Sequence, residues 1–262
     1  MFRKTTIVAA LVAVFLAPRL AFAQINFPKN VYYLAMGDSV AAGEGALPVT
    51  SGYVYDLYDR GVFGQKQDTE FASAALRGAR SWELRDHQAA QALCATTVLR
   101  PTVVTVTAGA NDFLRGDIDI FSIARRVAEA VDRLLNNGSG MVASPILDPR
   151  SLTPCPALRN VTILVSNYYS IPHPDPIIFA RLEAALIGFD QALRFWLQQV
   201  PIPAGSKVAI VDLYTPSRDR EGLVTIDRRL GFEDAFNFDV HPTNLGHSFI
   251  ARQFESVWQG LQ

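Results

Sequence analysis

The chain has 262 residues, of which 49% are hydrophobic and 19% are charged, and its formal net charge is −1. This length suits one α/β domain with a substantial core, and a near-neutral chain without runs of Lys or Arg gives no electrostatic basis for binding nucleic acid. After the N-terminal segment, no stretch is apolar for long enough to span a bilayer.

The first 23 residues have the pattern of a secretory signal peptide. A basic start is followed by an apolar core over residues 6–17 and by an A-x-A cleavage pattern at residues 21–23. That core is too short for a transmembrane helix. We therefore expect a mature chain of residues 24–262 that is secreted, or periplasmic in a Gram-negative source.

The apolar run from Val31 to Leu34 predicts a buried strand, which stops at Gly37-Asp38-Ser39. A glycine permits a sharp turn, so the Ser39 hydroxyl is expected at the carboxyl end of the strand, where open α/β sheets build their active sites. A lone serine of this kind is usually an ordinary turn residue. We interpret Ser39 as a nucleophile because its potential partners follow in order along the chain.

Strand and helix patterns alternate through the rest of the sequence. Further strands are predicted at 70–76, 103–107, 161–165 and 207–213, and helices after Ser81, over 120–135, over 175–197 and after Thr243. Asp175, which precedes Pro176, and Thr243 are the expected N-caps. Residues 214–238 are expected to be irregular. This order predicts a single domain with a three-layer, doubly wound sheet of about five parallel strands.

Three further motifs lie at the ends of predicted elements. Gly78 follows the second strand, Gly109-Ala110-Asn111-Asp112 follows the third, and His241-Pro242 precedes the last helix. The backbone N–H of a glycine can approach a ligand closely, an Asn amide is a neutral donor, and His is the base that works near neutral pH. Each residue alone could serve a turn, a cap or the surface, but their order favours a serine hydrolase site.

Together these motifs resemble the SGNH hydrolases, the GDSL lipase/esterase family, over nearly the whole mature chain. The resemblance implies a flavodoxin-like sheet order, Ser39 as nucleophile, His241 as base, and an oxyanion hole formed by Ser39, Gly78 and Asn111. It also implies a carboxylic ester hydrolase that works through an acyl-enzyme, with no metal or organic cofactor. The Asn that often precedes the glycine of the second motif is absent here.

The acid partner of the histidine departs from the family pattern. The family usually places an acid three residues before the histidine, and here that position is Phe238. Asp239 lies only two residues before His241. We predict Asp239 as the acid, with the backbone carbonyl of Phe238 as the alternative.

The other polar residues near the motifs receive structural roles. Asp38 and Asp112 are expected to be hydrogen-bonded structural acids because no cluster of metal ligands accompanies them. His247, one helical turn after His241, is expected on the surface of the last helix.

The chain has two cysteines, Cys94 and Cys155. In an oxidising compartment an even pair favours a disulfide, and two buried free thiols are the alternative. The family's sheet order makes the third and fourth strands neighbours, which brings both cysteines to the edge opposite the active site. We therefore predict a structural Cys94–Cys155 disulfide.

We expect a secreted, monomeric serine esterase or lipase that hydrolyses small-molecule or lipid esters. A carbohydrate acetyl esterase that uses the same site and a catalytically silent binding module of the same fold are the alternatives. An apolar pocket would favour lipid esters, whereas a small polar pocket would favour the acetyl esterase. A flavin-binding protein is disfavoured, since Gly37-Asp38-Ser39-Val40 lacks a phosphate-binding loop rich in Ser, Thr and Gly.

Overall fold

The computed structural model describes residues 30–95, 101–136, 156–173, 175–218, 220–224 and 240–262. Its centre is one parallel sheet in the order β2-β1-β3-β4-β5. The strands are β1 (Val31–Gly37), β2 (Thr69–Ser73), β3 (Val103–Thr107), β4 (Thr162–Ser166) and β5 (Lys207–Val211). This is the predicted flavodoxin-like order, and all four neighbouring pairs of strands are parallel.

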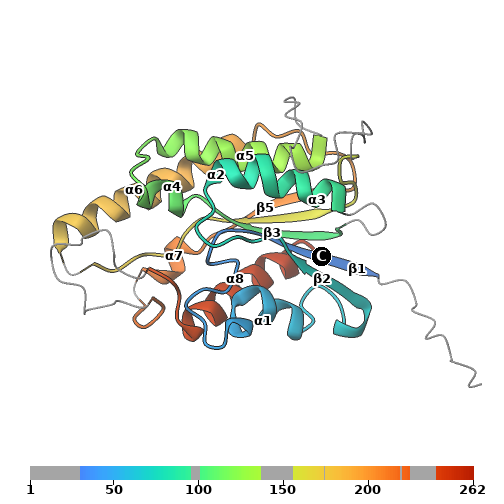
Figure 1. The fold of residues 1–262 in the computed structure, drawn as a ribbon, viewed down its shortest axis with the longest axis horizontal. Coiled ribbons are helices and arrows are strands. Elements are labelled where there is room, and N and C mark those ends of the chain that lie inside the picture. Colours follow the sequence, from blue (N-terminus) through green and yellow to red (C-terminus); the bar gives the residue numbers. More distant parts are fainter. Residues whose placement is uncertain (1–29, 96–100, 137–155, 174, 219, 225–239) are drawn as a thin grey trace, which may run out of the picture.

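Helices cover both faces of the sheet, as Figure 1 shows. One layer contains α2 (Ser81–Glu83), the π-helical turn η3 (Leu84–Gln88), α3 (Ala89–Ala95), α4 (Ala110–Leu114), α5 (Ile120–Asn136) and α6 (Pro176–Leu197). The opposite layer contains α1 (Tyr53–Asp59) and α8 (Asn244–Gly260). The short elements η1 (Val49–Ser51), η2 (Lys66–Asp68) and α7 (Tyr214–Ser217) lie in the connections. The predicted three-layer α/β architecture is confirmed.

The core follows from the apolar patterns of the elements. All five residues of β3 are buried, as expected for a central strand that is covered on both faces. In α5, Ile123, Val127, Val131 and Leu134 recur at helical spacing and are buried. The two expected N-caps are confirmed: Asp175 accepts the backbone N–H groups of the first turn of α6, and Thr243 does the same for α8.

Some element boundaries differ from the predictions, and the fifth strand ends at Val211 rather than at residue 213. The second strand ends at Ser73 rather than at residue 76, although the N–H of Leu76 still donates to the carbonyl of Gly37 at 3.0 Å. The region after Tyr214 begins with the helix α7 and is therefore not wholly irregular. Within the described ranges, no helix combines the length and the apolar character needed to cross a membrane.

Candidate active site

The turn after β1 presents Ser39 at the carboxyl edge of the sheet. Gly37 has φ +135°, and a Cβ atom built on it would lie 2.0 Å from the carbonyl oxygen of Thr107 in β3. Only glycine tolerates this approach. The next amide, from Asp38, donates to the same carbonyl at 2.9 Å. The neighbouring strands β1 and β3 are thus joined directly beneath the serine.

A buried glutamine holds the other side of this turn. Gln88 Oε1 accepts the N–H of Gly37 at 2.7 Å, and Gln88 Nε2 donates to the Gly37 carbonyl at 2.8 Å. Gln88 is the last residue of the π-helical turn, and its side chain is fully buried. Sequence reasoning missed this residue, because a single Gln in an amphipathic helix carries no signal of what it will contact.

Ser39 and His241 meet across 202 positions of sequence. The Ser39 Oγ and His241 Nε2 atoms lie 2.8 Å apart, within hydrogen-bonding distance. His241 is carried by the segment that leads into α8, where Pro242 forms an isolated bridge with Val224. A Cβ atom on Gly45 would lie 2.8 Å from the His241 Cβ, so the loop after Ser39 packs closely against the histidine.

The predicted partner of His241 cannot be compared with the structure. Asp239 and Phe238 both lie outside the described residues. Val240 is described, and its carbonyl accepts the Tyr169 hydroxyl at 2.8 Å. That bond anchors the residue just before His241, and the choice between Asp239 and the Phe238 carbonyl stays a prediction.

Gly78 and Asn111 lie on adjacent segments of the site. Gly78 has φ +72°, a conformation that favours glycine, and Asn111 occupies the first turn of α4. Asn111 Nδ2 donates to the carbonyl of Ala79 at 3.1 Å, which ties the amide to the residue after Gly78. An amide nitrogen carries two hydrogens, so Asn111 can still donate a second bond to a ligand.

Asp112 links the α4 segment that carries Asn111 to the segment after Gly78 through hydrogen bonds with Ser81. It is buried and accepts both the N–H of Ser81 at 2.6 Å and the Ser81 hydroxyl at 2.8 Å. Arg126 Nη2 approaches the same carboxylate at 3.3 Å and donates to Asp117 at 2.7 Å. The expectation that Asp112 is a hydrogen-bonded structural acid is confirmed. The contacts of Ser81 and Arg126 with Asp112 were not predicted.

Asp38 is the second structural acid, and it too is confirmed. Its Oδ1 accepts the N–H of Val40 at 3.0 Å, and its Oδ2 accepts a short hydrogen bond from the Tyr168 hydroxyl. Burial raises the pKa of Asp38 to about 6, while these donors and the nearby His241 act against the rise. The residue beside Ser39 is therefore a buried carboxyl group whose pKa is raised by burial.

The prediction for His247 is wrong. Its side chain is fully buried in α8 rather than exposed on it. Its Nδ1 accepts the N–H of Tyr53 at 3.2 Å and its Nε2 faces the carbonyl of Glu44 at 2.8 Å. Burial lowers the pKa of His247 to about 4, so it is a neutral structural residue that holds α1 and the loop after Ser39 against α8.

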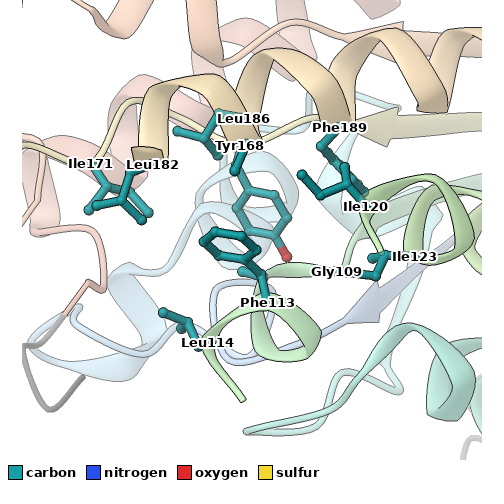
Figure 2. A pocket seen from close by; sticks show the side chains of 12 residues that line it. Gly109, Phe113, Leu114, Ile120, Ile123, Tyr168, Ile171, Leu182, Leu186 and Phe189 are labelled. Atoms are coloured by element: carbon teal, nitrogen blue, oxygen red, sulfur yellow. The ribbon is translucent and has the colours of Figure 1, made fainter. Parts of the chain in front are cut away.

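An apolar pocket opens beside α4, between α5, α6 and the segment that follows β4 (Figure 2). The Tyr168 ring forms part of its wall, so one side chain contacts both the pocket and Asp38. A Cβ on Gly109 would lie 3.1 Å from the Phe189 ring, which places Gly109 against the pocket's aromatic side. The lining is apolar apart from the tyrosine hydroxyl and comprises Gly109, Ala110, Phe113, Leu114, Ile120, Ile123, Tyr168, Ile171, Leu182, Ala185, Leu186 and Phe189.

The predicted Cys94–Cys155 disulfide also cannot be compared with the structure. Cys155 lies outside the described residues, and the side chain of Cys94 in α3 is not described. The pairing of β3 with β4, on which the prediction rests, is confirmed. In the part of the chain that the structure describes, no group of three His, Cys, Asp or Glu side chains is placed to hold a metal ion.

Solved structures with this fold are numerous, although their sequences are distant. A G-D-S-L family lipolytic protein from Veillonella parvula has a TM-score of 0.57 at 17% identity, with 87% of this chain and 98% of that chain covered. A family 3 carbohydrate esterase from Talaromyces cellulolyticus has a TM-score of 0.56 at 17% identity, covering 88% and 97%. TesA has a TM-score of 0.55 at 17% identity, covering 88% and 99%. At this identity the likeness establishes the fold.

The family assignment comes from the sequence match. Among curated protein sequences, no significant match was found. The model of the GDSL-like Lipase/Acylhydrolase family matches residues 35–249, which include the Ser39 turn, the Gly78 and Asn111 segments and His241. The chain therefore belongs to the GDSL-like lipase/acylhydrolase family and is a carboxylic ester hydrolase.

Proposed function

We propose that the chain is a secreted serine esterase or lipase in which Ser39 is the nucleophile and His241 the general base. The observation that carries this proposal is the 2.8 Å contact between Ser39 Oγ and His241 Nε2. A serine hydroxyl is a weak nucleophile until a base removes its proton, and the contact supplies that base directly. It also argues against a silent binding module, which has no need of this arrangement.

The reaction follows in two stages. As Ser39 Oγ attacks the ester carbonyl, His241 takes the hydroxyl proton and then delivers it to the departing alcohol, which leaves an acyl-enzyme. Water then repeats the sequence, with His241 again as base, and releases the acid. A partner at His241 Nδ1, either the Asp239 carboxylate or the Phe238 carbonyl, would hold the tautomer and stabilise the imidazolium.

The oxyanion formed in each stage needs donors that are already in position. We assign the N–H groups of Ser39 and Gly78 and the side-chain amide of Asn111. The Asn111–Ala79 bond supports this assignment because it fixes the amide beside the Gly78 backbone. The three donors are neutral, so none requires a charge to be desolvated in the free enzyme.

We assign the acyl group of the substrate to the apolar pocket. The pocket begins at Ala110, next to Asn111, and its wall includes the Tyr168 ring, whose hydroxyl contacts the acid beside Ser39. Each methylene buried there contributes about 0.8 kcal/mol. Lipid or other esters with an aliphatic acyl chain fit this lining better than acetylated sugars, which would leave it empty.

The remaining features of the proposal come from the sequence. Residues 1–23 are the signal peptide of a secreted or periplasmic enzyme and lie outside the described residues. We propose residues 24–262 as one catalytic domain that acts as a monomer without cofactor.

A panel of p-nitrophenyl esters tests the proposal. We expect kcat/KM to rise from the acetate to the hexanoate or octanoate. Ala185→Trp, which fills the pocket, should lower kcat/KM for the octanoate at least about tenfold while sparing the acetate. Ala184→Trp, one residue away on the exposed side of α6, is the matched control and should change neither. A preference for acetate that Ala185→Trp leaves intact would favour the acetyl esterase.

A further inference from the structure

An arginine side chain lies against the glycine of the proposed oxyanion hole. Arg115 follows α4, four residues after Asn111. Its Nη2 atom is 3.0 Å from the position that a Cβ atom would occupy on Gly78. The charged end of Arg115 thus covers Gly78, at the edge of the site where the ester carbonyl would be polarised.

The charge of Arg115 is not neutralised by the residues that the structure describes. The side chain is exposed, and none of the ion pairs among the described residues includes it. The nearby acids have other partners, since Glu44 pairs with Arg77, and Asp112 and Asp117 both face Arg126. Among the described residues, the surface around Gly78 therefore carries a positive charge that no acidic side chain pairs with.

A second arginine lies on the histidine side of Gly78. Arg77 is 76% exposed and reaches Glu44, whose neighbour Gly45 packs against His241 and Pro242. His241 is the group that would protonate the departing alcohol. Arg77 is thus connected, through Glu44 and Gly45, to the side of the site that carries His241.

The proposed acyl pocket differs in character from the surface at Arg115. Its lining contains no charged residue, and the α4 side chains that contribute to it are Ala110, Phe113 and Leu114. A negative charge on the acyl chain would be desolvated there without a partner, at a large cost. An anionic substituent that reaches the arginines would belong to the alcohol half of the ester.

From this arrangement we infer that Arg115, assisted by Arg77, selects esters whose alcohol carries a negatively charged group such as a phosphate or a sulfonate. Guanidinium groups match such oxyanions well because they present several N–H donors in one plane. The inference rests on the proposed function, since it requires the alcohol to leave past His241. It adds a charge requirement that the apolar pocket alone does not impose.

A matched pair of substrates tests the inference. 4-Sulfophenyl hexanoate and 4-sulfamoylphenyl hexanoate share the acyl chain and differ in the charge on the alcohol. We expect the ratio of their kcat/KM values, corrected for their rates with hydroxide, to favour the sulfonate. Arg115→Gln should lower this ratio by about 5- to 10-fold, mainly through KM, and Arg115→Lys should retain most of it.

Two further variants sharpen the result. Arg252→Gln removes the same charge from an exposed position on α8 and should leave the ratio unchanged. Glu44→Gln releases Arg77 from its partner and should raise the ratio. An equal ratio in wild type and Arg115→Gln, with both esters hydrolysed, would overturn the inference alone. Failure to hydrolyse either ester would instead overturn the proposed function.

Discussion

Two buried ionisable residues near the candidate site respond to pH in opposite ways. The folded-state pKa of Asp38 is raised from 3.8 to about 6, whereas that of His247 is lowered from 6.5 to about 4. Between pH 3.8 and about 6, Asp38 binds more protons in the folded protein than in the unfolded chain. Between pH about 4 and 6.5, His247 binds fewer protons in the folded protein than in the unfolded chain. Rising pH therefore destabilises the fold through Asp38 and stabilises it through His247, so the two effects oppose each other.

Asp38→Asn separates these contributions. The variant has no ionisable group at this position. As pH rises from about 4 to 7, the wild type should therefore lose stability through Asp38 while the variant does not, and the free energy of unfolding of the variant should rise relative to that of the wild type. Because the pKa of Asp38 rises from 3.8 to about 6 on folding, this relative increase in the free energy of unfolding is ~3 kcal/mol at most. Urea unfolding at intervals across this range measures the difference, in which the His247 contribution cancels. A difference that does not vary with pH would show that Asp38 does not titrate as described.

Asp239→Asn addresses the partner of the proposed base. If the Asp239 carboxylate stabilises the His241 imidazolium, this isosteric change should lower kcat by about 10³- to 10⁴-fold. The p-nitrophenyl hexanoate rate at neutral pH measures it. A loss smaller than about tenfold would assign the role to the Phe238 carbonyl.

At the scale of elements, the site depends on how three segments are joined beneath it. The turn after β1 is held by Thr107 from β3 and by Gln88 from the π-helical turn. A π-helical turn inserts one extra residue into a helix and so redirects the side chains that follow. Here the last residue of the π-helical turn is Gln88, whose side chain forms hydrogen bonds with both the N–H and the carbonyl of Gly37.

Gln88→Met tests this support. The change keeps the volume of the side chain but leaves the N–H of Gly37 without its partner in a buried site. We expect the free energy of unfolding to fall by about 2–4 kcal/mol, and kcat to fall because Ser39 loses its fixed position. Urea unfolding and ester hydrolysis measure the two effects. Gln91→Met, at an exposed position three residues later, is the matched control, and equal behaviour of the two variants would contradict the role of Gln88.

The elements themselves were largely predictable because the apolar patterns are strong. All five strands and the N-caps Asp175 and Thr243 follow from local sequence. The π-helical turn and the burial of His247 did not follow from it. Both depend on contacts with segments distant in the chain, and periodicity within one helix cannot reveal such contacts.

At the scale of the whole molecule, the sheet order gathers residues from across the chain. Ser39, Gly78 and Asn111 follow β1, β2 and β3, whose carboxyl ends share one edge of the sheet, and His241 reaches the same edge before α8. The motifs and the family resemblance together predicted that these residues share one site, and the structure brings Ser39 Oγ and His241 Nε2 within 2.8 Å. Gln88, Ser81, Arg126 and Tyr168 escaped prediction because they belong to no motif and act through buried hydrogen bonds.

The same sheet order underlies the disulfide prediction. A Cys94–Cys155 bond would close a loop of 155 − 94 = 61 positions, for which chain entropy gives a stabilisation of about 4 kcal/mol. We expect the denatured, unreduced protein from its native compartment to contain no titratable thiol. Two thiols under these conditions would refute the bond, and in that case reduction should leave the midpoint of thermal unfolding unchanged.

Covalent labelling of Ser39 tests the central claim most directly. The wild-type protein is treated with an organophosphonate, and the modified peptide is located by mass spectrometry. If Ser39 is the nucleophile that His241 activates, one label per chain should appear at Ser39. Ser39→Ala should then fold normally, take up no label and lose ester turnover by about 10⁴-fold or more. A label on another residue, or turnover that survives in Ser39→Ala, would contradict this account of the site.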